Sequence, residues 1–125
     1  MCACRASLPQ PAAAPQPDHA FVDVPYPPPA ARVERIPGRP SSDALWIDGQ
    51  WSWDGEQWAW EPGAWVAPAP ESRFARWQLR LDADGRLKFA GPSWRDASGR
   101  ETAPPRILAV AAGEKTGEPL PTQCR

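Results

Sequence analysis

The sequence predicts an all-β fold: a small antiparallel, Trp-rich β-meander of hairpins with about six to seven short strands. Eight tryptophans, stretches of alternating apolar and polar residues, and Gly-containing turn signals between them support this prediction. The 18 prolines and 9 glycines among 125 residues exclude a large core. Ten of the prolines precede residue 43. We therefore expect a disordered Pro-rich tether over residues 1–30, a hairpin-repeat domain over residues 31–112 and a disordered tail over residues 113–125.

The Pro-rich arm shows neither helical nor sheet periodicity over residues 7–29, which favours an extended polyproline II conformation. We interpret it as a tether. The alternative is that residues 24–29, Val-Pro-Tyr-Pro-Pro-Pro, are a ligand for an aromatic groove, in another protein or in this one. Residues 31–36 alternate small or apolar with charged residues and predict an edge strand that Pro37 and Pro40 terminate.

The middle of the chain carries a repeated W-x-x-G-x-W pattern, at residues 46–51 and again at residues 60–65. A related turn, at residues 53–58, lies between the two copies. Asp48-Gly49 between apolar runs predicts a type I′ hairpin turn, because glycine adopts positive φ without strain. Pro62-Gly63 suits a type II turn, which fits a tight hairpin poorly. Four short strands are expected, at about residues 44–47, 50–53, 57–60 and 64–67.

These turns predict a register that places all the central indoles on one face of the sheet. The expected cross-strand pairs are Trp46 with Trp51, Trp51 with Trp60, Trp53 with Trp58, and Trp60 with Trp65. The opposite face receives a mixed set, including Leu45, Ile47 and Val66, that would tolerate water. A contiguous apolar face packs against something or marks an interaction site. The predicted binding face is therefore Trp46, Trp51, Trp53, Trp58, Trp60 and Trp65.

A second hairpin is expected from residues 77–81 and 86–90, in which Leu81 faces Leu87 and Leu79 faces Phe89. This pairing requires a three-residue loop with Gly85 in the left-handed conformation. Its apolar face would close over part of the Trp sheet, and its outer face is basic, with Arg76, Arg80, Arg86 and Lys88. Residues 106–112 predict a last short strand, with a buried turn of helix as the alternative.

The W-x-x-G-x-W copies, preceded by residues 28–34 and followed by Trp77 and the turn at residues 84–87, resemble the YXWGXW-repeat proteins of bacterial envelopes, many of them lipoproteins. The resemblance covers about residues 27–105. This chain has Trp where the family name has Tyr, and no signal sequence precedes Cys2. The resemblance implies an envelope location, as an outer-membrane lipoprotein or in the periplasm, if a signal is encoded upstream of Met1. Otherwise the location is cytoplasmic.

The cysteines lie at the chain ends and therefore do not form a core disulfide framework. Cys2 and Cys4, followed by the Pro-rich arm, look like the first mature residues of a bacterial lipoprotein and are the candidate lipidation sites. The pair with the lone His19 is a poor ligand set for zinc. The fate of Cys124 is open.

Catalytic machinery is absent from the sequence as we interpret it, so we expect neither an enzyme nor a cofactor or metal site. His19 lies in the Pro-rich arm, where nothing fixes its geometry. A glycosidase-like carboxylate pair drawn from the acids between residues 43 and 66 is better explained by turn formation. Phosphate-binding loops are missing.

Two functions remain. The first is a non-catalytic structural or protein-interaction module of the cell envelope that presents the Trp face on its tether, with an envelope protein as partner. The alternative is glycan binding, of peptidoglycan or polysaccharide, by stacking on exposed Trp. Nucleic acid is not expected, because the net charge is −1 and the Trp segment is acidic. The membrane is reached only through a lipid anchor, and a monomer is expected because prolines and charges protect the strand edges.

Overall fold

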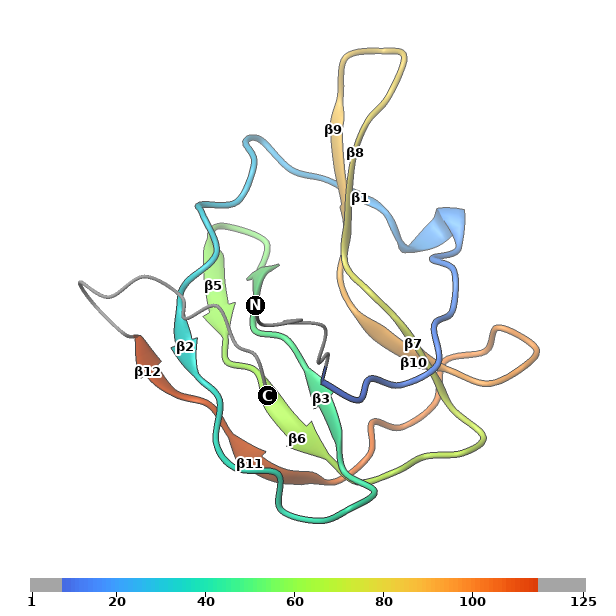
Figure 1. The fold of residues 1–125 in the computed structure, drawn as a ribbon. Coiled ribbons are helices and arrows are strands. Elements are labelled where there is room, and N and C mark those ends of the chain that lie inside the picture. The colour runs from blue at the N-terminus through green and yellow to red at the C-terminus, as the bar shows by residue number, and fades with distance from the viewer. Residues whose placement is uncertain (1–7, 115–125) are drawn as a thin grey trace, which may run out of the picture.

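The computed structural model describes residues 8–114 and has an all-β fold of small antiparallel sheets (Figure 1). Within these residues the one helical element is the short 3-10 helix η1 (Asp18–Ala20). In this part of the chain no helix has the length and apolarity needed to cross a membrane. Between residues 8 and 114, twelve short strands pair in five sheets, ordered β1-β9-β8, β10-β7, β11-β6-β3, β12-β2 and β4-β5.

Residues 45–66 form one long, interrupted hairpin, which we call the first hairpin. Strand β4 (Gln50–Trp53) pairs with β5 (Trp58–Glu61), and β3 (Leu45–Ile47) pairs with β6 (Ala64–Val66) in the same register. The predicted pairs Trp51 with Trp60 and Trp53 with Trp58 are confirmed. The predicted pairs of Trp46 with Trp51 and of Trp60 with Trp65 are wrong, because Trp46 pairs with Trp65.

The hairpin turn predicted at Asp48-Gly49 is therefore also wrong. A type I′ turn needs positive φ at both central residues, and Gly49 does not have it, whereas Gly55 at the true tip has φ 104°. Asp48-Gly49 and Pro62-Gly63 instead lie opposite each other where the ladder is interrupted. We call this interruption the first break.

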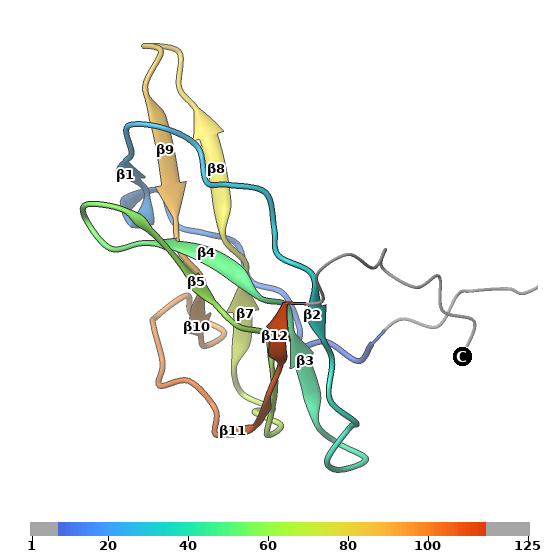
Figure 2. The ribbon, with the colours of Figure 1, turned by 90° about the vertical axis from the view of Figure 1, so that its left-hand side faces the viewer.

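The second hairpin has the same design. Strand β8 (Gln78–Leu81) pairs with β9 (Leu87–Ala90), and β7 (Arg73–Ala75) pairs with β10 (Ser93–Arg95) in a continuous register. The predicted facing pairs, Leu81 with Leu87 and Leu79 with Phe89, are confirmed, as is the left-handed Gly85, with φ 83°. Strands β7 and β10 were not predicted. The tip of β8 and β9 projects from the rest of the protein (Figures 1 and 2).

Residues 8–30 differ from the predicted disordered tether, because they have defined backbone partners on both hairpins. The carbonyl of Pro9 accepts the N–H of Trp46 at 2.7 Å, and the backbone of Phe74 bonds to Ala12 and Ala14. Strand β1 (Val22–Asp23) then adds to the edge of β9, and Val24 is buried. Proline rings can pack against the Trp-rich surface while their carbonyls remain available as acceptors, so a Pro-rich composition does not exclude docking.

The C-terminal part of the described chain returns to the first hairpin. Strand β11 (Ile107–Val110) pairs with β6, so the strand prediction for residues 106–112 is confirmed. Strand β12 (Ala112–Glu114) pairs with β2 (Glu34–Arg35), which confirms the predicted edge strand (Figure 1). Pairing extends to Glu114, two residues into the predicted tail. Cys2, Cys4, Cys124 and residues 115–125 lie outside the described residues.

The core divides into three clusters, and the indoles are not on one face. Trp46 and Trp65 pack with Ala44, Leu8 and β11. Their strand neighbours Leu45, Ile47 and Val66 pack instead on Phe74 and Trp94 of the second hairpin, although a water-tolerant face was predicted. In β4 and β5 the tryptophans themselves, Trp51, Trp53 and Trp58, pack against the second hairpin.

The physical reason for this division is the spacing of the repeat. Trp46 and Trp51 are five residues apart, an odd number. In a ladder that continues through the break, side chains separated by an odd number point to opposite sides. The one-face prediction required a turn at Asp48-Gly49 and is wrong without it.

Candidate functional site

The tryptophans of the repeats form three cross-strand pairs along the first hairpin, which we call the Trp ladder. The ring centroids are 5.4 Å apart for Trp46 and Trp65, 5.3 Å for Trp51 and Trp60, and 5.2 Å for Trp53 and Trp58. The interplanar angles of 64°, 71° and 65° are edge-to-face. This geometry places the positive ring edge of one indole against the negative face of its partner, and each such pair contributes ~0.5–1.5 kcal/mol beyond burial.

The two glycines of the repeats make the ladder possible. A Cβ on Gly49 would lie 2.5 Å from Cζ2 of Trp60, and one on Gly63 would lie 2.7 Å from Cζ2 of Trp46. Each glycine therefore leaves room for the first tryptophan of the other copy. This reciprocal packing explains the W-x-x-G-x-W spacing, since the two copies run antiparallel and each supplies both the indole and the gap.

One N-terminal segment, residues 26–37, accepts the indole N–H groups along the ladder, and we call it the covering segment. Trp58 donates to the carbonyl of Tyr26 at 3.2 Å, and Trp51 donates to the carbonyl of Ala30 at 3.0 Å. Trp60 donates to Oε2 of Glu34 at 3.0 Å, and Trp65 to the carbonyl of Pro37 at 2.7 Å. Because buried indole N–H groups need partners, this segment satisfies four of them.

Side chains of the covering segment also pack on the rings. Tyr26 meets Trp53 edge-on, with the centroids 5.8 Å apart. The guanidinium of Arg32 lies 4.9 Å from the ring centroid of Trp51 and 5.9 Å from that of Trp60, within cation–π range. Of the two interpretations of residues 24–29, the structure therefore shows an internal ligand of this protein's own aromatic surface.

Each break in a hairpin is capped by one side chain from the N-terminal part of the chain. At the first break, Oε1 of Glu34 accepts the backbone N–H of Gly63 at 3.0 Å. The second hairpin is interrupted between β7 and β8 and between β9 and β10, and we call this the second break. There the side-chain amide nitrogen of Gln16 donates to the carbonyls of Arg76, at 2.8 Å, and Gly91, at 2.7 Å. Backbone groups that lose their ladder partner must bond elsewhere when they are buried, so these two side chains stabilise the interruptions.

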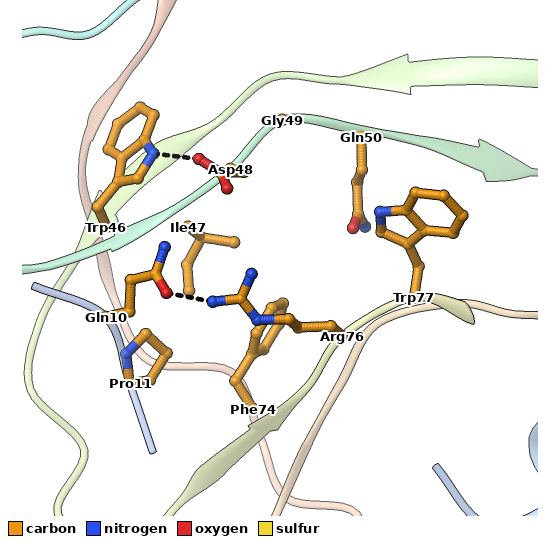
Figure 3. A pocket seen from close by; sticks show the side chains of 10 residues that line it. All are labelled: Gln10, Pro11, Trp46, Ile47, Asp48, Gly49, Gln50, Phe74, Arg76 and Trp77. Carbon is orange, nitrogen blue, oxygen red and sulfur yellow. Dashed lines mark hydrogen bonds between the residues drawn. The ribbon is translucent and has the colours of Figure 1, made fainter. Parts of the chain in front are cut away.

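A groove opens where the covering segment, the first break and the second hairpin meet. It has a volume of about 310 Å³ and is lined by Pro28, Pro29, Ala31, Gly49, Gln50, Trp51, Trp60 and Trp77. A smaller adjoining cavity of about 70 Å³ shares Gly49, Gln50 and Trp77 and reaches Gln10 and Pro11 (Figure 3). Sequence reasoning placed Trp77 only in the cover of the Trp sheet, yet 42% of this residue is exposed.

The predicted binding residues are thus differently placed. Trp46, Trp58 and Trp65 are buried, at 9% exposure or less, while Trp51, Trp53 and Trp60 are half-buried. Trp51 and Trp60 reach the groove together with Trp77. Gln50, also at the groove, is only 8% exposed. Neighbouring side chains along β4 point to opposite sides, so the sequence carries no signal that would place Gln50 beside Trp51 at this groove.

The basic outer face of the second hairpin is paired with acids. Lys88 lies 2.9 Å from Asp23 and Arg86 lies 3.1 Å from the same carboxylate, while Arg80 contacts Asp82 at 2.8 Å. The hydrogen bond from Lys88 is the main reason that the pKa of Asp23 is lowered. Since β1 brings Asp23 to this face, much of the positive charge of the face is balanced within the chain.

The remaining polar candidates have structural roles. Asp48 accepts the indole N–H of Trp46 at 2.7 Å. Asp54 closes the hairpin tip by accepting the N–H groups of Gln57 and Glu56, in that order the main causes of its lowered pKa. His19 is exposed in η1. Among residues 8–114 no group of three or more side chains is arranged to hold a metal ion.

The fold and the site define a small all-β protein built around a tryptophan ladder. Residues 45–66 match the family model of the WXXGXW repeat, in two copies, so the chain carries the repeat that the resemblance indicated. No curated protein and no solved structure matches the chain.

Proposed function

We propose that this protein is a non-catalytic structural or protein-interaction module of the bacterial cell envelope. The observation that supports this most directly is the covering segment, which accepts four indole N–H groups of the Trp ladder. The ladder is therefore part of the protein's own core and holds the two hairpins and the covering segment together. A partner would contact the surfaces that remain accessible around the ladder.

Glycan binding by a row of stacked tryptophans is the weaker candidate. A sugar ring stacks on a flat, accessible aromatic face, but the rings of each pair meet edge-to-face and the six indoles are divided between two sides of the hairpin. Arg32 also lies over the rings of Trp51 and Trp60. These contacts leave no row of coplanar rings.

The envelope location and the lipid anchor are supported by the family resemblance and by Cys2 and Cys4 near Met1. In this proposal the modified cysteine holds the module at a membrane, and the sheet domain acts a short distance from the lipid surface.

Titration of the full chain with peptidoglycan fragments and chito-oligosaccharides, followed by tryptophan fluorescence and calorimetry, tests the choice of function. We expect no saturable change in emission and no heat of binding. Saturable binding of any of these glycans would replace the proposed function with the alternative.

Fractionation tests the location. The gene would be expressed from its own locus, with its upstream sequence, in the presence of a labelled fatty acid. We expect the protein in the membrane fraction and labelled, with the label lost in one of the variants Cys2→Ala and Cys4→Ala. Recovery of unlabelled protein only from the cytoplasm would contradict an envelope function.

A further inference from the structure

No charged side chain lines the groove between the covering segment and Trp77, although Arg32 lies over the rings of Trp51 and Trp60. Two prolines and an alanine of the covering segment form one wall, and the indoles of Trp51, Trp60 and Trp77 form the others. Its one polar side chain is Gln50. A ligand that fits must therefore be uncharged over its buried part, present an apolar surface and need few hydrogen bonds.

We propose that this groove binds an uncharged proline-rich segment of a partner protein in the polyproline II conformation. The protein already binds such a segment to the same aromatic surface, because the carbonyls of Tyr26 and Ala30 flank three consecutive prolines and accept indole N–H groups. Pro28 and Pro29 of that segment line the groove. A second proline-rich strand laid beside them would extend an interface that the fold has already built.

The hydrogen-bond donors at the groove fit this ligand. Proline has no backbone N–H, so a polyproline II strand offers only carbonyl acceptors and binds to surfaces that supply donors. Within the described part of the chain, the indole N–H of Trp77 and the side-chain amide of Gln50 form no hydrogen bond. Figure 3 shows the nitrogen edge of Trp77 directed toward the Gln50 side chain. Both residues line the groove and the smaller cavity.

A sugar fits this groove less well. The hydroxyl groups of a pyranose would be buried against prolines and indoles with one amide as partner, and each unpaired hydroxyl costs ~1–3 kcal/mol. The apolar composition therefore favours pyrrolidine rings, which pack between aromatic walls as they do in other polyproline-binding domains.

The ligand belongs to another protein rather than to a second copy. The proline-rich stretch at residues 24–31 already covers the Trp ladder of its own chain, and the stretch at residues 9–17 is bonded to Trp46 and Phe74. Within residues 8–114 these segments are engaged, so a second copy would have to unfold them to donate one.

The test uses the full chain and an acetylated, amidated decaproline peptide, with a Gly-Ser peptide of equal length as the control ligand. We expect saturable binding of decaproline, measured by calorimetry, together with a change in tryptophan emission. Trp77→Ala should weaken it about tenfold or more, because an exposed aromatic at the centre of such a site carries much of the affinity. Trp77→Phe, which keeps a ring but removes the donor, should weaken it less.

Leu81→Ala is the matched control, because Leu81 lies on the same hairpin, is 70% exposed and is outside the groove. This variant should bind as the native chain does. Circular dichroism and the unfolding midpoint show whether each variant is folded. Equal binding of both peptides, no binding of decaproline, or undiminished binding by a folded Trp77→Ala variant would overturn the proposal, as would self-association in sedimentation that decaproline does not reverse.

This inference rests on the proposed function, whose failure is separately visible. If decaproline does not bind while glycans also fail to bind and the protein fractionates with the envelope, the groove proposal is wrong and the interaction module stands. If a glycan binds at Trp77, both are wrong.

Discussion

The carboxylate of Glu34 accepts the indole N–H of Trp60 at 3.0 Å, although the two residues lie far apart in sequence. Its second oxygen accepts the backbone N–H of Gly63, also at 3.0 Å. One side chain thus bonds to the first tryptophan and to the glycine of the second repeat copy. The covering segment is thereby fixed to the break in the Trp ladder.

Replacing Glu34 by alanine should lower the free energy of unfolding by about 1.5–3 kcal/mol, because two partly buried donors lose a charged acceptor. Glu34→Gln keeps one acceptor oxygen and should lose roughly half as much. Urea unfolding followed by tryptophan fluorescence measures both. Glu56→Ala, at an exposed turn position, is the control and should leave the midpoint unchanged. Equal midpoints for Glu34→Ala and the control would show that the bridge contributes nothing.

The glycines of the repeats should not tolerate alanine. Gly49→Ala forces a methyl group against the Glu34 carboxylate and the Trp60 indole. Gly63→Ala forces one against the Trp46 indole and nearby backbone. Each should cost about 2–3 kcal/mol through overpacking. Gly38→Ala is the matched control, since a Cβ there meets no atom within 4 Å and its φ is not positive. Its effect should stay within about 0.5 kcal/mol. Thermal unfolding ranks the three variants by stability. If Gly38→Ala were the least stable of the three, the reciprocal packing would be contradicted.

Exchanging residues 26–30 for a Gly-Ser sequence of the same length should expose the Trp ladder. The exchange removes Tyr26 and the docked prolines, and the more flexible segment loses more conformational entropy when it docks. We expect a red shift of the tryptophan emission, faster acrylamide quenching and a lower unfolding midpoint. Gly-Ser in place of residues 97–98, which changes only Ala97 in an exposed turn, is the control. An unchanged emission maximum would mean that the arm is the tether that composition predicts.

Acid should destabilise the protein through two turn carboxylates. The pKa of Asp54 lies below its ordinary value of 3.8 because the backbone N–H groups of Gln57 and Glu56 donate to it. The pKa of Asp96 is lowered by the hydroxyl of Ser98 and the N–H of Arg100. Since the folded pKa values are the lower ones, the stabilisation is present above pH 3.8 and is lost as the pH falls through the folded values.

The double variant Asp54→Asn, Asp96→Asn cannot titrate at these positions but keeps the acceptor oxygens. Its unfolding midpoint in urea should therefore fall less than that of the native chain between pH 6 and pH 3. Parallel loss in both proteins would assign the acid sensitivity to other groups.

Turn chemistry made much of the second hairpin predictable from sequence. Asp82 and Gly85 specify a short loop with one left-handed residue, and the alternation of Leu79 and Leu81 then sets the register. The pairs around Asp54-Gly55 followed for the same reason. In both cases the local signal and the tertiary fold agree.

The prediction of a turn at Asp48-Gly49 was wrong because glycine has two structural uses that look alike in a sequence. It can supply positive φ, or it can leave space for a neighbouring side chain. At Gly49 the second applies, and the neighbour, Trp60, belongs to the other repeat copy. The groove was missed for a related reason: Gln50 and Trp77 meet only after both hairpins and the covering segment have assembled.

The pairing of β2 with β12 also determines when the protein can finish folding. Glu34 emerges from the ribosome early, whereas Ala112 to Glu114 emerge near the end of the described chain, several seconds later at ~5–20 residues per second. Until then the first hairpin lacks its partner strand β11, and β2 lacks its partner strand β12. Distant partners of this kind slow folding. Nascent chains would therefore leave indoles accessible to chaperones during that interval, and completion would come as one late, cooperative closure.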